Sequence, residues 1–155
     1  MRNIFIITLL FLFLTFKAYS ESVNEINVVG NDRVSAETII LFSGFKDKDK
    51  VNPEILNSII KNLYSTNFFS DVKVSTKDGK LLITVVENPV VEEIEFIGIK
   101  NKKILEVLNE NIKLKTKTSF LLNELKSDEQ LISNILRSNG FYFSEISTSI
   151  QNNDN

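Results

Sequence analysis

The sequence predicts an α+β protein of two tandem βααββ modules, each a three-stranded mixed sheet covered by two helices. Three observations lead to this fold class: strand and helix patterns that alternate after residue 20, a well-capped central helix, and an internal repeat. In the repeat, residues 23–30 (VNEINVVG) align with residues 91–98 (VEEIEFIG) at a constant offset of 68, and internal repetition guides a fold assignment better than any single element. We expect a signal peptide at 1–20, a first module at 21–88, and a second module at 89–155 that lacks its last strand.

The first 20 residues have the composition of an export signal. Arg2 precedes the run 4–16, which is apolar except for two threonines, and Ala18-Tyr19-Ser20 places small residues where a signal peptidase cleaves. The alternative is an uncleaved membrane anchor, but a spanning helix needs about 20 apolar residues and this run has 13. We expect cleavage after Ser20 and a mature chain that works outside the cytoplasm.

Composition argues against several classes of function. The chain has 155 residues, no Cys, no His and a formal net charge of −2. Without thiols and imidazoles there is no Cys–His nucleophile, no usual zinc ligand set and no ordinary general base near neutral pH. Nucleic-acid binding needs clustered Lys and Arg, which this charge balance does not favour. We therefore expect no enzymatic activity, no cofactor and no metal.

One short motif resembles a catalytic pair. Ser58-Ile59-Ile60-Lys61 matches the S-x-x-K pattern of serine–lysine acyl enzymes. Its companion motifs are missing, and both polar members fall on the exposed side of the predicted helix. A short motif without its structural context is mostly chance, so an enzyme is the least favoured class.

Turn and capping residues delimit the elements of the first module. A strand is expected at 25–29, and a short helix lies between the N-cap Ser35 and the C′ residue Gly44. Asn52-Pro53-Glu54 begins a longer helix, whose buried face consists of Ile55, Leu56, Ile59, Ile60 and Leu63. An alternating strand follows at 69–75, and Asp78-Gly79 is a preferred type I′ hairpin turn. Residues 81–86 are apolar on both faces and are expected to form the central strand.

The second module repeats part of this order. Asn101 caps a predicted helix, and the longer helix after it is expected to bury Leu121, Leu122, Leu125, Ile132, Ile135 and Leu136. Phe143-Ser144-Glu145-Ile146 echoes Phe69-Ser70-Asp71-Val72, but no third strand follows. The aromatic pair at 68–69 and the aromatic triplet at 141–143 could form a peptide-binding patch, although aromatics between a helix and a strand more often fill the core.

Four segments together resemble a known family. They are Val28-Val29-Gly30-Asn31, Asn52-Pro53, Asn67-Phe68-Phe69-Ser70-Asp71-Val72-Lys73-Val74, and the bridge Glu87-Asn88-Pro89-Val90-Val91. The pattern resembles the polypeptide-transport-associated (POTRA) domains of the BamA-type outer-membrane protein assembly factors. The resemblance implies a non-enzymatic scaffold on the periplasmic face of the outer membrane. It implies as partners unfolded outer-membrane proteins, periplasmic chaperones and accessory lipoproteins of the assembly complex. In the family such domains precede a C-terminal membrane β-barrel, which this sequence does not contain.

The contact mode suggested for such domains is β-augmentation, in which an extended peptide pairs with a free sheet edge. If residues 81–86 are central, the preceding strand has one unpaired row of backbone groups. The candidate peptide-binding residues are therefore Val72, Lys73, Val74 and Ser75. The alternative is an ordinary edge that the charges of Asp71, Lys73 and Lys77 protect from pairing.

Two other functions fit the same residues. One is a single-pass inner-membrane division or secretion protein that carries such domains, for which the N-terminal run would stay attached. The other is a translocation or two-partner secretion porin, which differs from an assembly factor only in sequence beyond these modules.

Overall fold

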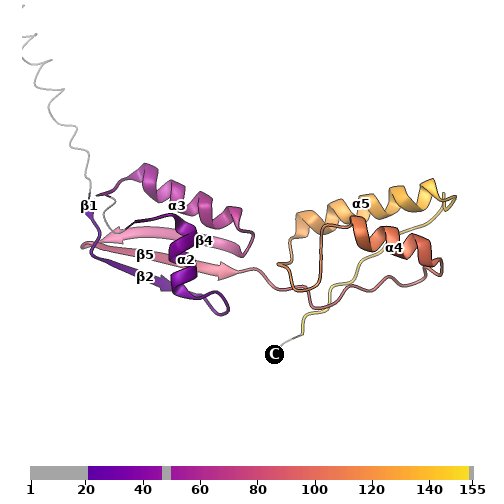
Figure 1. The fold of residues 1–155 in the computed structure, drawn as a ribbon, viewed down its shortest axis with the longest axis horizontal. Helices are drawn as coiled ribbons and strands as arrows, with labels where there is room; N and C mark the ends of the chain where they lie inside the picture. Colours follow the sequence, from indigo (N-terminus) through magenta and orange to yellow (C-terminus); the bar gives the residue numbers. More distant parts are fainter. Residues whose placement is uncertain (1–20, 47–49, 154–155) are drawn as a thin grey trace, which may run out of the picture. The chain divides into compact units, whose positions relative to one another are not determined.

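The computed structural model describes residues 21–46 and 50–153. The predicted signal peptide, residues 1–20, lies outside the described residues. The chain divides into two compact units, the first ending at Glu87 and the second beginning at Asn88 (Figure 1).

Unit 1 contains a three-stranded mixed sheet. Its strands are β2 (Glu25–Val29), β4 (Phe69–Lys77) and β5 (Lys80–Glu87), in the order β2-β5-β4 (Figure 1). β2 runs parallel to β5, and β4 runs antiparallel to it. The prediction that residues 81–86 form the central strand is confirmed. A second, two-stranded sheet pairs β1 (Glu21–Ser22) with β3 (Lys50–Val51).

Local capping positions the two helices of unit 1. α2 (Ala36–Ser43) begins where Ser35 Oγ accepts the N–H of Thr38 at 3.3 Å, and it ends at Gly44, whose φ is 71°. α3 (Pro53–Ser65) begins where Asn52 Oδ1 accepts the N–H of Ile55 at 2.8 Å. A side-chain oxygen at the N-cap satisfies an amide that the helix itself leaves free. Both helix starts were predictable from these residues.

The helices cover one face of the sheet. On β5 the side chains alternate, so that Leu81, Ile83 and Val85 are buried while Leu82 and Val86 are exposed. The buried face packs against both helices in one core, whose fully or nearly fully buried members are Ile39, Phe45, Val51, Ile59, Leu63, Phe69, Val72, Leu81, Ile83 and Val85. The sheet therefore has a core face and an open face, as an antiparallel or mixed sheet with one covered side commonly has.

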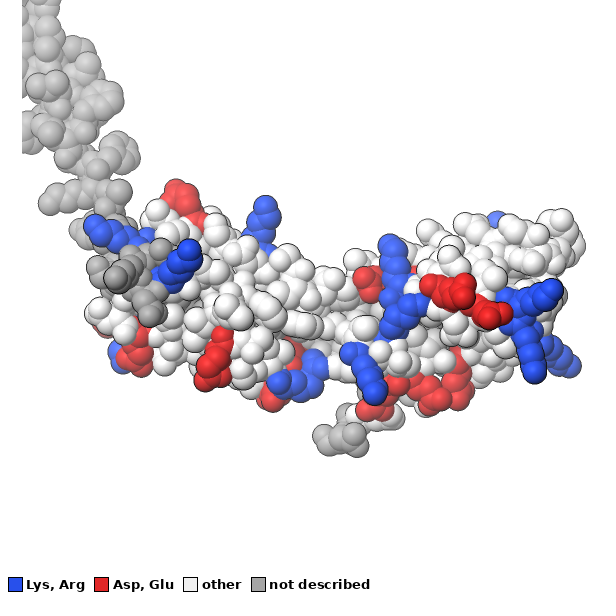
Figure 2. All heavy atoms as spheres, in the orientation of Figure 1, with Lys and Arg blue, Asp and Glu red and all other residues white. Residues whose placement is uncertain are grey.

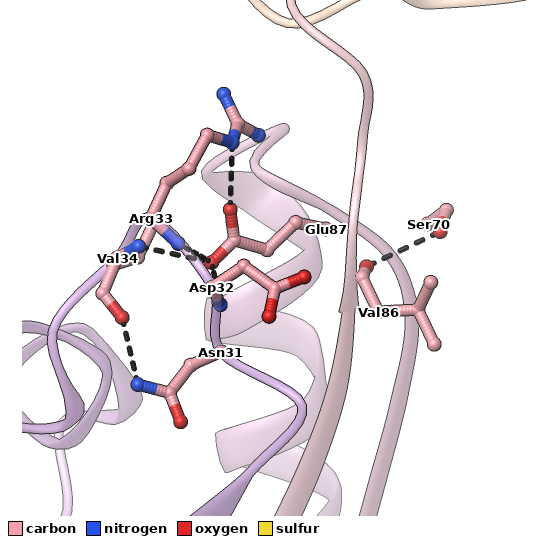
Figure 3. Close-up of polar contacts among 7 residues, drawn as sticks. All are labelled: Asn31, Asp32, Arg33, Val34, Ser70, Val86 and Glu87. Atoms are coloured by element: carbon pink, nitrogen blue, oxygen red, sulfur yellow. Dashed lines mark hydrogen bonds and ion pairs between the residues drawn. The ribbon is translucent and has the colours of Figure 1, made fainter. Parts of the chain in front are cut away.

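Glu87, the last residue of β5, fastens the loop that follows β2 (Figure 3). Its Oε1 accepts the backbone N–H groups of Asp32 and Arg33 at 3.0 Å and of Val34 at 2.9 Å, and its Oε2 lies 3.0 Å from Nε of Arg33. Burial is the largest single influence on the pKa of Glu87 and would raise it. The three amide donors and the Arg33 charge together outweigh burial, so the pKa of Glu87 lies below its ordinary value of 4.5.

We expect Glu87→Gln to lower the free energy of unfolding of unit 1 by about 1–3 kcal/mol at neutral pH, because a charged acceptor of several amides is lost. A carboxyl whose pKa is lower in the folded state stabilises that state above the ordinary value. The contribution disappears as the pH falls through the folded-state pKa. Urea denaturation followed by circular dichroism between pH 7 and pH 3 should therefore show wild type and Glu87→Gln converging in acid. The control is Glu37→Gln, an exposed acid of α2. If the stabilities of wild type and Glu87→Gln differ by the same amount at every pH, the ionised Glu87 carboxylate is not the source of the difference.

Unit 2 contains two helices, α4 (Lys102–Asn111) and α5 (Leu122–Ser138). The buried side chains of its core come from both: Ile104, Leu108 and Leu136. Asp128 of α5, which is 3% exposed, accepts the N–H of Lys113 at 2.8 Å and of Leu114 at 2.9 Å. This buried carboxylate ties the loop between the helices to α5.

The segments of unit 2 that align with strands of unit 1 do not form a ladder with one another. Among the described residues of unit 2, the pairing is limited to an isolated bridge between Val90 and Ser119. Unit 1 gives the reason, because β2 and β4 both pair with β5 and not with each other. The corresponding segments at 91–98 and 143–146 need a third strand between them, which agrees with an incomplete second module.

Some expected core positions are wrong. Leu122 is 55% exposed because it is the first residue of α5, ahead of the buried stripe. Phe141, Tyr142 and Phe143 are exposed as well, since the segment that carries them has no strand beside it. Of the aromatic pair in unit 1, Phe69 is buried, while Phe68 is 38% exposed with its ring 5.9 Å from that of Phe42.

Candidate functional site

The four candidate residues Val72, Lys73, Val74 and Ser75 lie in the middle of β4. β4 forms one edge of the sheet, and among the described residues the one strand that pairs with it is β5. It has nine residues, whereas β2 at the opposite edge has five. The sheet of unit 1 thus offers its longer unpaired backbone row along β4.

Side chains along β4 alternate between the two faces of the sheet. Val72 is 5% exposed and Val74 is half-buried toward the helices, while Lys73 and Ser75 are exposed on the open face. An added strand would therefore meet apolar side chains on one side and polar ones on the other, which is the pattern of a half-buried strand.

The hairpin fixes which backbone groups of β4 point outward. Asp78 and Gly79 have φ of 53° and 74°, the conformation of a two-residue type I′ turn. Such a turn makes the flanking pair, Lys77 and Lys80, a hydrogen-bonded pair of the ladder, and the next pairs alternate. In that alternation Lys73 turns its N–H and C=O toward β5. Val74 turns them toward the free edge.

An independent contact supports this direction. The outward series along β4 consists of Val72, Val74 and Thr76. The N–H of Val72 donates to the hydroxyl of Tyr64 on α3 at 3.2 Å, so it does not point at β5. Sequence reasoning missed Tyr64 and Thr76. The Asp78-Gly79 turn could have identified Thr76 from the sequence. The residue pair that flanks a two-residue turn is hydrogen-bonded, and the pairs after it alternate, so the turn determines which residues of β4 direct their backbone groups outward.

Charges border the edge on its open face. Asp71 Oδ2 lies 3.0 Å from Nζ of Lys73, and the hydrogen bond from Lys73 is the main reason that the pKa of Asp71 lies below its ordinary value. Both side chains are exposed, so this pair contributes little to stability. Figure 2 shows that Lys and Arg are interspersed with Asp and Glu on the visible face of each unit, rather than gathered in one patch.

The S-x-x-K candidate is not arranged as a catalytic pair. Ser58 Oγ donates to the carbonyl oxygen of Glu54 one helical turn earlier, at 2.9 Å. Ser58 and Lys61 are both exposed on α3. A nucleophile needs a base within hydrogen-bond reach of its oxygen. Here the Ser58 hydroxyl is hydrogen-bonded to the backbone of its own helix instead.

The repeat and the fold correspond to one protein family. The POTRA family model, described as a surface antigen variable number repeat, matches residues 21–88 and again residues 89–155.

The chain belongs to the POTRA family.

Proteins named outer membrane protein assembly factor BamA are similar to this POTRA chain in sequence. The chain is 38% identical over 79 residues to the protein of Neisseria meningitidis serogroup B, a match that covers 51% of the chain and 10% of that protein. It is 24% identical over 139 residues to the protein of Nitratidesulfovibrio vulgaris, covering 84% and 17%. For Neorickettsia risticii the identity is 30% over 94 residues, covering 61% and 12%. The chain thus spans between 10% and 17% of the length of these relatives.

Solved POTRA structures share the fold. The N-terminal domain of Omp85 from Thermosynechococcus elongatus superposes with a TM-score of 0.57 at 17% identity, covering 87% of this chain and 59% of that one. POTRA1-2 of the periplasmic domain of Omp85 from Anabaena gives 0.52 at 15% identity, covering 87% and 90%. At these identities the likeness establishes the fold alone, and that fold is the α+β arrangement expected from the sequence.

In residues 21–46 and 50–153, no helix is long and apolar enough to cross a membrane. The same residues contain no group of three acidic side chains that could hold a metal ion.

Proposed function

We propose that this chain is the exported, periplasmic POTRA portion of an outer-membrane protein assembly factor. Its partners are unfolded outer-membrane proteins, the periplasmic chaperones that deliver them and accessory lipoproteins of the assembly complex. The BamA relatives support the proposal, since they carry that name and are similar to this chain over 79 residues in one case and 139 in another. The N-terminal run with Ala18-Tyr19-Ser20 supports export.

The free edge of β4 is the surface that we propose for client binding. Transmembrane β-strands are segments of about ten residues with alternating apolar and polar side chains. Such a segment is unpaired before it enters a barrel, so its backbone groups need partners. β4 offers outward backbone groups at Val74 and Thr76, with a half-buried side chain on one face and Ser75 on the other. The observation that carries the proposal is this nine-residue strand with one bonded side.

Proline substitutions at adjacent positions test the edge. Proline removes a backbone N–H, and its ring occupies the same space. We expect Val74→Pro to weaken binding of a peptide of about ten residues from a transmembrane β-barrel strand by about tenfold or more, because one outward donor is lost and the edge is obstructed. Thr76→Pro should act alike. Lys73→Pro should instead disrupt the sheet, because its N–H points at β5.

Binding is measured by NMR shift perturbation on the full chain, and folding by circular dichroism. Peptide-induced shifts along β2 in place of β4 would move the contact to the opposite edge. If Val74→Pro and Thr76→Pro both fold and bind as wild type does, the β4 edge is not the binding surface.

A further inference from the structure

The hydroxyl of Tyr64 occupies one of the backbone donors that β4 turns to its free edge. The N–H of Val72 donates to it at 3.2 Å, so an incoming strand finds this position already bonded. Ladder hydrogen bonds run roughly in the plane of the sheet. The hydroxyl oxygen of Tyr64 therefore lies where a carbonyl oxygen of an added strand would have to lie.

Polar contacts from β4 itself hold this side chain in place. The hydroxyl of Tyr64 donates to Asp71 Oδ1 at 3.3 Å, and Asp71 Oδ2 in turn pairs with Lys73 at 3.0 Å. A tyrosine hydroxyl has one proton to donate and can accept at the same time. Its proton serves Asp71 and its oxygen accepts from Val72. Both capacities are used on the same strand, so the hydroxyl has a defined place at the edge.

The helix fixes the other end of the side chain. Tyr64 belongs to the last turn of α3, and its carbonyl oxygen accepts the N–H of Asn67 at 3.1 Å as the chain leaves the helix toward β4. The neighbouring helix residue Leu63 is fully buried in the core. The backbone beneath the ring is thereby anchored, while Tyr64 as a whole is 40% exposed and accessible to a partner at the edge.

We propose that Tyr64 sets the limit of strand addition: it stops an added segment before Val72 and confines pairing to the stretch from Val74 to Thr76. This inference rests on the function proposed above and defines the ligand of that site as a short extended segment. Recognition through so few backbone bonds tolerates many sequences. Each bond contributes little, so release is easy, which suits a surface that passes clients on.

Amide hydrogen exchange by NMR on the full chain tests the stop, with the same barrel-strand peptide as probe. In wild type the peptide should slow exchange at Val74 and Thr76 and leave Val72 unchanged. In Tyr64→Ala, Val72 should exchange faster in the free protein because its acceptor is gone. The peptide should then protect Val72 as well, and binding should tighten about two- to tenfold from the added pairing.

Two further variants separate the parts of the effect. Tyr64→Phe keeps the ring and removes the hydroxyl. Val72 should lose protection in the free protein, and the peptide should then protect it, because the hydroxyl is the group that occupies the position of the incoming carbonyl oxygen. Tyr142→Ala removes an exposed tyrosine of unit 2 and should behave as wild type. Should Tyr64→Ala not fold, Tyr64→Phe decides: peptide protection of Val72 in this variant supports the stop, and its absence overturns the stop.

The outcomes distinguish the limit that Tyr64 sets, called the stop, from the proposed client binding along the edge of β4. If peptide protects β4 equally in wild type and Tyr64→Ala, with Val72 unaffected in both, the stop is overturned and the edge function stands. If peptide binds only Tyr64→Ala, Tyr64 blocks the whole edge, and both the confined pairing proposed here and the edge function of the wild-type protein are overturned. If neither protein shows protection along β4, the stop and the edge function fall together.

Discussion

Gly30→Ala is expected to destabilise unit 1 by about 4 kcal/mol or more, a loss that core clashes and strained backbone reach together. Gly30 directly follows β2 and has a φ of 84°, a conformation that residues with a Cβ rarely adopt. A Cβ built on this residue would lie 2.2 Å from the carbonyl oxygen of Val85 in β5. That oxygen belongs to the central strand, so relief of the clash requires the sheet itself to shift.

The repeat supplies a matched control. Gly98 occupies the equivalent position in unit 2, with a φ of 90°, but a Cβ there would meet nothing within 4 Å. Gly98→Ala should therefore lower the free energy of unfolding of unit 2 by about 1 kcal/mol, the cost of placing a residue with a Cβ in a left-handed backbone conformation. Amide exchange in β5 reports on unit 1, and exchange in α4 reports on unit 2. Equal losses for the two variants would show that backbone conformation, rather than the approach of Val85, explains the glycine.

Much of unit 1 follows from local sequence because its decisive signals are local. Ser35 and Asn52 cap helices through amides three residues away, and Asp78-Gly79 closes a hairpin between neighbouring strands. Such signals need no knowledge of the rest of the fold. The central position of β5 followed from an apolar run bounded by polar punctuation, although only one face of that strand is covered.

The features that sequence reasoning missed are long-range or too short to be periodic. The paired strands β1 and β3 have two residues each, and no hydrophobic period can be detected over two residues. The contact of Glu87 with Asp32, Arg33 and Val34 joins residues more than 50 positions apart. Nothing in the identity of a single glutamate distinguishes such an anchor from an exposed charge.

The candidate site shows the same division. The pattern of β4 located an edge strand, and the four residues chosen lie on it. Whether that edge is open along its whole length depends on Tyr64, which approaches from the end of a helix and bonds the backbone of Val72 eight residues later. In the sequence, Tyr64 is one of several residues on the polar face of an amphipathic helix, and nothing distinguishes it from the others.

Ile59→Ala is expected to reduce the free energy of unfolding of unit 1 by about 2–5 kcal/mol, the range for large-to-small changes in a core. Ile59 is 1% exposed on α3 and belongs to the core cluster that the helices form with β4 and β5. Truncation removes buried methyl groups and leaves a cavity that fixed neighbours on both helices and the sheet cannot readily fill.

The magnitude is large relative to the whole unit. A module of roughly 65 residues has a total stability of only about 3–10 kcal/mol, so Ile59→Ala should leave a measurable unfolded population of unit 1. Lys61→Ala, two residues along and exposed on the same helix, should change stability by less than about 0.5 kcal/mol. Urea denaturation with amide exchange in β5 as the reporter for unit 1 compares the two variants. Equal small losses would mean that α3 does not present Ile59 to the core, because a fully packed side chain and an exposed one cannot be removed at the same cost.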